Sequence, residues 1–281
     1  MSGTNFKDGV SSMGVPILGS GFLSGGSHFF VDPVNGSDGN TGKTWAKAFK
    51  TLSYAHGQCT AGKNDVVYLI GNGDTTGTAR ESVTLAWSKD ATHLIGITAA
   101  PTVASRARIA TTSGVDFSPL ITVSADGCYI ANIHAFHGYN TAETQICLNV
   151  TGQRNVFANC HWAGMGHATA GDQAASASVV LTGDGENTFI RNIIGLDTIA
   201  RSTTNAEIDL KTAAVRNRFI DCDIVTFADN AGHLFVKAGT SGDLDRFTIF
   251  EKCRFINAVA STATTMTAAM SVHASAGGMI V

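Results

Sequence analysis

The chain has 281 residues and a formal net charge of −3, and only 15% of its residues are charged while 44% are hydrophobic. The hydrophobic fraction is enough for a core, and a weakly negative chain without any basic run excludes a nucleic-acid or anionic-membrane surface. With 31 Gly and 4 Pro, the composition favours a β protein with many tight turns.

The first 28 residues differ from the rest of the chain. The stretch TNFKDGVSSMGVPILGSGFLSGG (4–26) has apolar residues that glycine separates too closely for a helix. We predict an extended arm over 1–28 that docks on another protein, and the alternative is a disordered tail. The predicted docking residues are Phe6, Val10, Met13, Val15, Ile17 and Leu18.

The N-terminus lacks a cationic start followed by an apolar run, and no apolar stretch approaches the ~18 residues that span a bilayer. We therefore expect a chain that is made and folded in a cytosol, without a membrane partner. The 6 cysteines are then expected to be free thiols.

One segment, near 44–57, has helical periodicity. Trp45, Phe49, Leu52 and Ala55 fall on one face, and Thr44 is placed to cap the first turn. We predict that this short helix covers the open end of a repeated β structure, whose first strands otherwise expose core and unpaired backbone.

The loop before this helix raises two ligand hypotheses. SDGNTGKT begins with Ser37 where a phosphate-binding loop needs Gly, and no βαβ pattern follows it. Asp32, Asn35, Asp38 and Asn40 carry oxygen ligands for calcium, but their spacing fits no EF-hand, and turn chemistry explains them more simply. The sequence predicts no cofactor and no metal site.

A motif recurs from residue 130 onward: an apolar pair, a polar residue, Asn or Asp, and an apolar strand. We call the second apolar residue of each pair the anchor. The anchors are Ile130, Phe157, Ile190, Phe219 and Phe250. In a strand every second residue faces inward, but here the inward positions after each anchor are shifted by one residue. The chain must therefore bend at that point. Asn and Asp tolerate the left-handed backbone conformation of such a bend. We predict a stacked turn ladder formed by Asn132, Asn159, Asn192 and Asp221.

A second series of alternating strands precedes the first, with inward positions at Val123, Val150, Leu181, Leu210, Val236 and Val272. Two strand series with one irregular common period predict an all-β fold, a right-handed parallel β-helix over 29–281. An antiparallel sandwich is the alternative, but it does not require the same turn five times.

The chemistry-bearing residues of the repeat have structural explanations. Cys160, Cys222 and Cys253 follow the turns and are expected to pack as core thiols. His134 and His161 are expected to face outward on adjacent rungs, in a column that Asp223 and Arg254 extend. The Asp pairs 221/223 and 243/245 lie in turns or Gly-rich loops. No catalytic residue is assigned.

The stretch FVDPVNGSDGNTGKTWAKAFKTL (30–52) resembles the N-terminal motif of pectate-lyase-like right-handed parallel β-helix proteins, many of them phage or secreted bacterial proteins; Phe49, Thr51 and Leu52 match its Phe-x-Thr-Leu ending. The arm is similar to the N-terminus of small virion proteins encoded among phage head genes. Together these resemblances imply the fold and a virion location, and they specify function poorly.

The leading hypothesis is a non-enzymatic structural protein of a tailed-phage virion, assembled in the host cytoplasm. As a homotrimer, it would decorate or cement the capsid surface by binding the major capsid protein through its arm. The alternative is a tailspike-like or fibre protein that binds or cleaves host surface polysaccharide, because β-helix enzymes place acids on outer faces.

Overall fold

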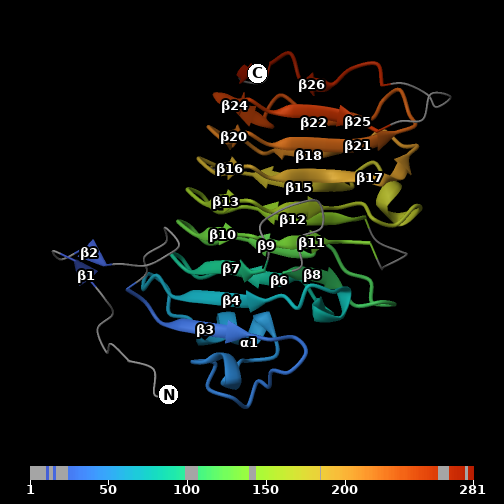
Figure 1. Cartoon of the computed structure of the whole chain (residues 1–281). Helices are drawn as coiled ribbons and strands as arrows, with labels where there is room; N and C mark the ends of the chain where they lie inside the picture. Colours follow the sequence, from blue (N-terminus) through green and yellow to red (C-terminus); the bar gives the residue numbers. More distant parts are fainter. Residues whose placement is uncertain are drawn as a thin grey trace.

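The computed structural model describes residues 11–12, 15–16, 25–98, 107–138, 144–183, 185–258, 266–275 and 278–281. The chain winds into a solenoid of three parallel sheets (Figure 1). From β4 to β26 every turn, or rung, contributes one strand to each sheet, whereas β3 and β27 add strands to the first sheet alone. The predicted right-handed parallel β-helix is thereby confirmed.

The sheets are named here in the order in which one rung visits them. The first sheet contains β3 (His28–Val31), β4 (Val66–Ile70), β7 (His93–Ile97), β10 (Tyr129–Ala131), β13 (Val156–Ala158), β16 (Thr188–Ile190), β20 (Arg218–Ile220), β24 (Phe247–Glu251) and β27 (Gly278–Ile280). The second contains β5 (Ala79–Glu81), β8 (Arg108–Thr111), β11 (His134–Phe136), β14 (His161–Ala163), β17 (Ile193–Arg201), β21 (Asp223–Ala228) and β25 (Arg254–Asn257). The third contains β6 (Leu85–Trp87), β9 (Ile121–Val123), β12 (Ile146–Val150), β15 (Ala177–Thr182), β18 (Ala206–Lys211), β22 (Leu234–Ala238) and β26 (Met270–Val272).

The remaining elements are short. The described pieces β1 (Ser11–Ser12) and β2 (Val15–Pro16) pair antiparallel, and β19 (Ala214–Val215) pairs parallel with β23 (Leu244–Asp245). The helical pieces are η1 (Trp45–Lys47), α1 (Leu52–Gln58), η2 (Thr75–Gly77) and η3 (Ala170–Asp172). None of the helices in these described ranges is long and apolar enough to cross a membrane.

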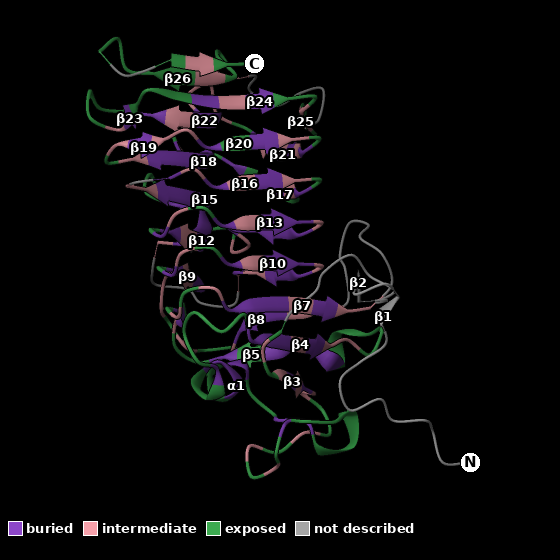
Figure 2. Ribbon diagram, turned by 90° about the vertical axis from the view of Figure 1, so that its left-hand side faces the viewer, coloured by how far each residue is buried: buried purple, intermediate pink, exposed green. Residues whose placement is uncertain are grey.

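The core runs along the solenoid axis because alternate residues of each strand point inward. Figure 2 shows this as buried strands bordered by exposed turns. Phe157, Phe189, Phe219 and Phe250 stack on successive rungs, with centroid separations of 4.6, 4.7 and 4.6 Å. These spacings match the ~4.8 Å between neighbouring strands, so each ring rests on the next.

The anchor assigned to Ile190 is wrong by one residue. In the parallel register Phe157 pairs with Phe189, and Phe189 pairs with Phe219, so Phe189 is the inward residue of that rung. Ile190 points outward and is only partly buried.

The turn from the first to the second sheet has a left-handed residue on every rung that the sequence aligns: Asn132 (φ 58°), Asn159 (φ 53°), Arg191 (φ 52°), Asp221 (φ 54°) and Lys252 (φ 55°). Asn132, Asn159 and Asp221 thus share this left-handed column, and Arg191 occupies it on the rung to which Asn192 was assigned. Asn192 occupies the next column and is buried. Its side-chain oxygen accepts from the backbone N–H of Cys160 (3.2 Å) and from Trp162 Nε1 (3.2 Å).

A different asparagine column forms the hydrogen-bonded ladder. Asn155, Asn187 and Asn217 immediately precede the first-sheet strands and are all buried. The backbone N–H of Asn155 donates to Asn187 Oδ1 (3.0 Å), and that of Asn187 donates to Asn217 Oδ1 (3.1 Å). Asn187 Nδ2 also donates to the carbonyl of Gly152 (3.1 Å), so each side chain satisfies backbone groups on the preceding rung.

The second strand series is mostly in the expected register. Val123, Val150, Leu181 and Leu210 align along the third sheet. Val236 instead pairs with Ile208, two residues from its expected partner, and Val272 pairs with Ala238. A two-residue shift preserves the face, and Val236 is accordingly buried in the core.

The predicted cap over 44–57 is present but is interrupted. Thr44 makes no side-chain capping bond, and η1 ends before a single bridge between Val31 and Phe49. The α-helix starts after Thr51, whose Oγ1 accepts from the Tyr54 N–H, while Trp45 is 54% exposed. Phe49, Leu52 and Ala55 are buried as expected and close this end of the core.

The proposed arm is only partly described. Phe6, Val10, Met13, Ile17 and Leu18 lie outside the described residues, and Val15 is in the backbone of β2. The first sheet begins at His28, and the division into 1–28 and 29–281 stays a prediction.

Candidate functional site

Charged side chains gather at the turn from the third sheet to the first. Arg154 (φ 57°), Glu186 (φ 56°), Arg216 (φ 48°) and Arg246 (φ 70°) are left-handed residues. The first three stand two residues before β13, β16 and β20, and Arg246 directly precedes β24. The N–H of Arg154 donates to the carbonyl of Gly185 (3.1 Å), and that of Glu186 donates to the carbonyl of Val215 (2.7 Å). The backbone ladder therefore holds one charged side chain per rung at the same corner.

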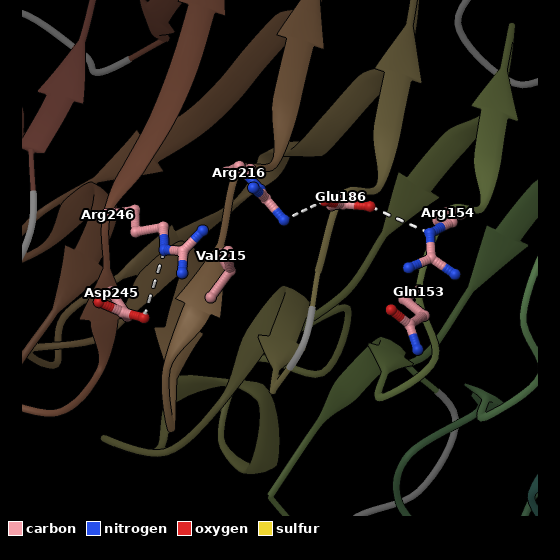
Figure 3. Close-up of a pocket in the computed structure, with 7 residues that line it drawn as sticks. All are labelled: Gln153, Arg154, Glu186, Val215, Arg216, Asp245 and Arg246. Atoms are coloured by element: carbon pink, nitrogen blue, oxygen red, sulfur yellow. Dashed lines mark hydrogen bonds and ion pairs between the residues drawn. The ribbon is translucent and has the colours of Figure 1, made fainter.

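The side chains form a short chain of ion pairs (Figure 3). Glu186 lies between two guanidiniums: Arg154 Nε donates to its Oε2 (3.0 Å), and Arg216 pairs with its Oε1. Arg246 lies 3.9 Å from Asp245, an ion pair without a hydrogen bond. Glu186 thus orients two arginines, while Arg246 keeps its donors open on the outer side.

These side chains line an open cavity of about 380 Å³ together with Gln153 and Val215. Three guanidiniums against two carboxylates leave one net positive charge. The side chains of Arg154 and Arg246 are 65% and 58% exposed, so both can reach a ligand. We name this site the arginine pocket.

The arginine pocket has the chemistry for binding carboxylates. A guanidinium presents paired N–H donors that match a carboxylate in two hydrogen bonds. Among the described residues, Arg154 is engaged through Nε alone, so both terminal nitrogens are available to a ligand. Arg216 and Arg246 lie on adjacent rungs, about 4.8 Å apart, and Arg154 lies two rungs before Arg216, so the column would place several donors along an extended anionic chain.

An aromatic strip lies at the other end of the first sheet's outer face. It consists of His28, Phe30, Trp45 and Tyr68. Phe30 is 5.1 Å from Trp45 and 5.3 Å from Tyr68 between ring centroids, and His28 stacks on Tyr68 at 5.7 Å. Such flat, partly exposed rings offer a negative face to C–H groups of a bound ligand.

A second cavity, of about 250 Å³, adjoins this strip. Tyr68 and Tyr129 line it together with the ends of β7 and β10. Burial raises the pKa of both phenols above the usual range, so the hydroxyls stay neutral donors. The first sheet and the turn that leads into it thus combine aromatic, hydroxyl and cationic groups.

The histidine column does not form an exposed site. His134 and His161 lie on adjacent rungs and stack at 4.6 Å, but both are buried. His161 Nε2 contacts the carbonyl of Gly195 (3.0 Å), and burial lowers its pKa. Asp223 and Arg254 do extend the column outward and form a bidentate pair at 2.5 and 2.6 Å.

A separate ionic cluster is enclosed between the second and third sheets. Arg201, Glu207 and His233 are fully buried, and His233 Nε2 lies 3.7 Å from Glu207 Oε1. Asp172 holds the loop above them by accepting from the N–H groups of Ser202 (2.9 Å) and Thr203 (3.0 Å). Because these side chains are shielded from solvent, we assign them to the interior rather than to ligand binding.

The loop residues considered for calcium serve the turns. Asp32 Oδ1 accepts from the N–H groups of Val34 (2.9 Å) and Asn35 (3.0 Å), and Asp38 Oδ1 accepts from those of Lys50 (2.9 Å) and Thr51 (3.0 Å). In the part of the chain that the structure describes, no cluster of three or more His, Cys, Asp or Glu side chains could hold a metal ion.

Sequence reasoning did not identify the arginine pocket. The sequence does contain a signal for it, which is a charged residue directly before each buried asparagine: Arg154–Asn155, Glu186–Asn187 and Arg216–Asn217. It becomes visible only when the repeats are aligned on those asparagines instead of on the following turn.

Comparison with known proteins supports the fold. No family model matches the sequence, and no curated protein matches it. Among solved structures, pectate lyase Pel9A superimposes with a TM-score of 0.56 and 15% identity over 89% of this chain; the chain spans 58% of the length of Pel9A. A rhamnogalacturonan lyase superimposes with a TM-score of 0.50 and 12% identity, covering 91% of this chain and 84% of the lyase. ORF18 of Geobacillus virus E2 gives a TM-score of 0.46 and 12% identity over 75% of this chain and 46% of that protein, too weak to carry an argument.

These matches correct one expectation. We expected no enzyme, but solved structures that superimpose on this chain include a pectate lyase and a rhamnogalacturonan lyase, so the exclusion of enzymatic activity does not hold. At 12–15% identity the likeness concerns the fold and not the reaction. The chain has the pectate-lyase-like right-handed parallel β-helix fold, shared with enzymes that act on polysaccharides.

Proposed function

We propose that this chain binds an acidic polysaccharide along the outer face of the first sheet and acts on it. The observation that carries the proposal is the arginine pocket, in which Arg154, Arg216 and Arg246 occupy equivalent positions on separate rungs. A polymer with a carboxylate on its sugar units would present anions at intervals to this row of guanidiniums.

The aromatic strip supports the same ligand class. A sugar ring has one face rich in C–H groups, which pack on the negative face of an aromatic ring, while its hydroxyls bond to polar neighbours. Trp45 and Tyr68 supply such faces, and His28 Nδ1 lies 3.1 Å from Tyr68 Oη. From β4 to β20 the first sheet spans five strand spacings, about 24 Å, which suits an extended chain of several sugars.

Pectate and rhamnogalacturonan are the first substrates to test, since the superimposed lyases are named for them. Binding is measured by affinity electrophoresis, and cleavage by the increase in reducing ends. We expect binding to weaken as salt rises, because the pocket is exposed and its ion pairs are screened.

The matched variants are Arg246→Gln and Arg154→Gln, against Lys63→Gln as an exposed control away from the pocket. Each arginine variant should weaken binding about 5- to 30-fold, equivalent to about 1–2 kcal/mol for an exposed charge-assisted pair. Unchanged affinity in both, with unchanged cleavage, would overturn the proposal.

We place this activity in a tailspike-like or fibre protein of a tailed phage. The support is the likeness of residues 4–26 to virion-protein N-termini. Capsid decoration by a homotrimer, through Phe6 to Leu18 and the major capsid protein, stays a prediction. Deleting residues 1–28 checks it: a decorating protein loses capsid binding, whereas a polysaccharide-active β-helix keeps its cleavage.

A further inference from the structure

A third cavity lies at the N-terminal end of the solenoid, away from the arginine pocket. Its volume is about 320 Å³, and it opens between the segment leading into α1 and the edge strand β5. The polar residues that line it are Lys50, Thr51, Thr76, Thr78, Arg80 and Glu81.

Glu81 is the buried acid of this cavity. It ends β5, pairs with Thr111 of β8, and is only 7% exposed. Burial raises the pKa of its carboxyl to about 7. Near neutral pH the group therefore exists both as a hydrogen-bond donor and as an acceptor.

Two cations stand at the opening. Lys50 and Arg80 are exposed, and Arg80 Nη1 donates to the carbonyl of Thr111 (3.1 Å), which fixes the direction of its side chain. Two further carboxylates contact lining residues or their neighbours, and both accept hydrogen bonds. Asp38 accepts from Thr51 Oγ1 (2.9 Å), and Asp74 accepts from the N–H of Thr75 (2.5 Å).

The threonine hydroxyls retain capacity for a ligand. Thr78 Oγ1 donates to the carbonyl of Thr75 (2.7 Å) and can still accept. Thr76 Oγ1 accepts from Asn72 Nδ2 (2.9 Å) and can still donate. A cavity with an acid, two cations and two such hydroxyls matches a ligand that is both hydroxylated and anionic.

We propose that this cavity is a separate binding site for a single carboxylated sugar, with the sugar's carboxylate at Lys50 and Arg80 and its hydroxyls at Glu81 and the threonines. Phosphate fits less well, because its second negative charge would face the Glu81 carboxyl. A cavity of this volume, at the end of the solenoid, suits one sugar unit or a chain end. The proposal does not depend on the arginine pocket binding polysaccharide.

The test is calorimetric titration of the full chain with galacturonic acid at about pH 5.5 and about pH 8, values either side of the Glu81 transition. Glucose and inorganic phosphate are the comparison ligands. We expect galacturonic acid to bind at both pH values and at least about threefold more tightly at the lower one, because neutral Glu81 no longer repels the ligand's carboxylate. Glucose, which lacks the carboxylate, should not bind.

Three variants identify the groups. Lys50→Met and Arg80→Met, both at exposed positions, should weaken binding at least about tenfold together. Glu81→Gln keeps a donor of similar shape and should retain binding while losing the pH dependence. Arg154→Gln, in the arginine pocket, should leave this titration unchanged.

Three results would overturn the proposal: no binding of galacturonic acid, equally tight binding of phosphate, or an unchanged pH dependence in Glu81→Gln. An effect of Arg154→Gln on the titration would also overturn it, since the ligand would then occupy the arginine pocket. The polysaccharide proposal is tested separately by Arg154 and Arg246, so the two can fail independently.

Discussion

At the scale of single residues, asparagine performs two different tasks in adjacent turns. Asn159 supplies a left-handed backbone conformation (φ 53°), and its side chain makes no hydrogen bond among the described residues. Asn187 supplies hydrogen bonds, with Oδ1 and Nδ2 both engaged on the preceding rung. Glycine can also adopt the left-handed conformation, but it has no side chain to form the hydrogen bonds.

We therefore expect Asn187→Gly to lower the free energy of unfolding by about 2–4 kcal/mol, because two buried backbone groups lose their partners. Asn159→Gly should change it by less than about 1 kcal/mol, since glycine adopts the same conformation without strain. Urea unfolding measures both. Equal losses in the two variants would contradict the division of tasks.

At the scale of elements, columns of identical residues pack neighbouring rungs against each other. Phe189 lies between Phe157 and Phe219, whereas Phe250 meets Phe219 on one side and is bordered by Phe255. Removal of a central ring leaves a cavity between two rungs that the backbone ladder prevents from collapsing.

Phe189→Ala should cost about 3–5 kcal/mol of unfolding free energy, and Phe250→Ala should cost less because it lies nearer the end of the stack. Thermal unfolding monitored by circular dichroism checks the order. If Phe250→Ala proved the more damaging change, the stack would not be the main source of rung-to-rung stability.

The cysteine column behaves differently along its length. Cys160 and Cys222 are buried, as predicted, but Cys253 is partly exposed. Burial raises the pKa of Cys160 to about 12, whereas a hydrogen bond from the Cys222 thiol lowers that of Cys253. Two of the three expected core thiols are thus buried, and the third, Cys253, is partly exposed.

A maleimide reagent should modify Cys253 in the native protein, and the other five cysteines only after unfolding, because the thiolate must form and be reached. Mass spectrometry of digested peptides locates the label. Rapid native modification of Cys160 or Cys222 would place their column on the surface.

Elements were more predictable than the site. Alternation identified the strands and their inward faces, since burial imposes a period of two. The register at Phe189 was missed because Arg191 takes the left-handed position there, which no local rule assigns to arginine, and the nearby Asn192 mimics the expected pattern. The arginine pocket was missed because it joins residues about thirty positions apart, and only the correct register brings them together.

At the scale of the whole molecule, buried titratable groups set the response to pH. Burial lowers the pKa of His56, His93, His137 and His233 to about 4. Stability that depends on their neutral form is present above pH ~6.5 and is lost as the pH falls through ~4. Burial raises the pKa of Glu81 and Glu207 to about 7, and the stability from their neutral form, present below ~4.5, is lost as the pH rises through ~7.

Between pH ~4.5 and ~6.5 the two effects oppose each other, and four histidines outweigh two glutamates. We expect the melting temperature to be highest near pH 6.5 and to fall steadily on acidification. Differential scanning calorimetry across this range gives the curve. His137→Gln should flatten its acidic limb, and a melting temperature that rises toward pH 4 would contradict the assignment.

The hydrogen bonds of all three sheets join one rung to the next, and therefore lie along the axis of the solenoid (Figure 1). When the two ends of the solenoid are pulled apart, the interfaces between rungs are loaded one after another in series and do not share the force. Every rung interface carries the full load, and the first to yield is the one with the fewest interactions. The interfaces around Asn155, Asn187 and Asn217 carry extra side-chain bonds and should hold. Rupture should instead begin at the terminal rungs, so that the solenoid unfolds from its ends and not from its middle.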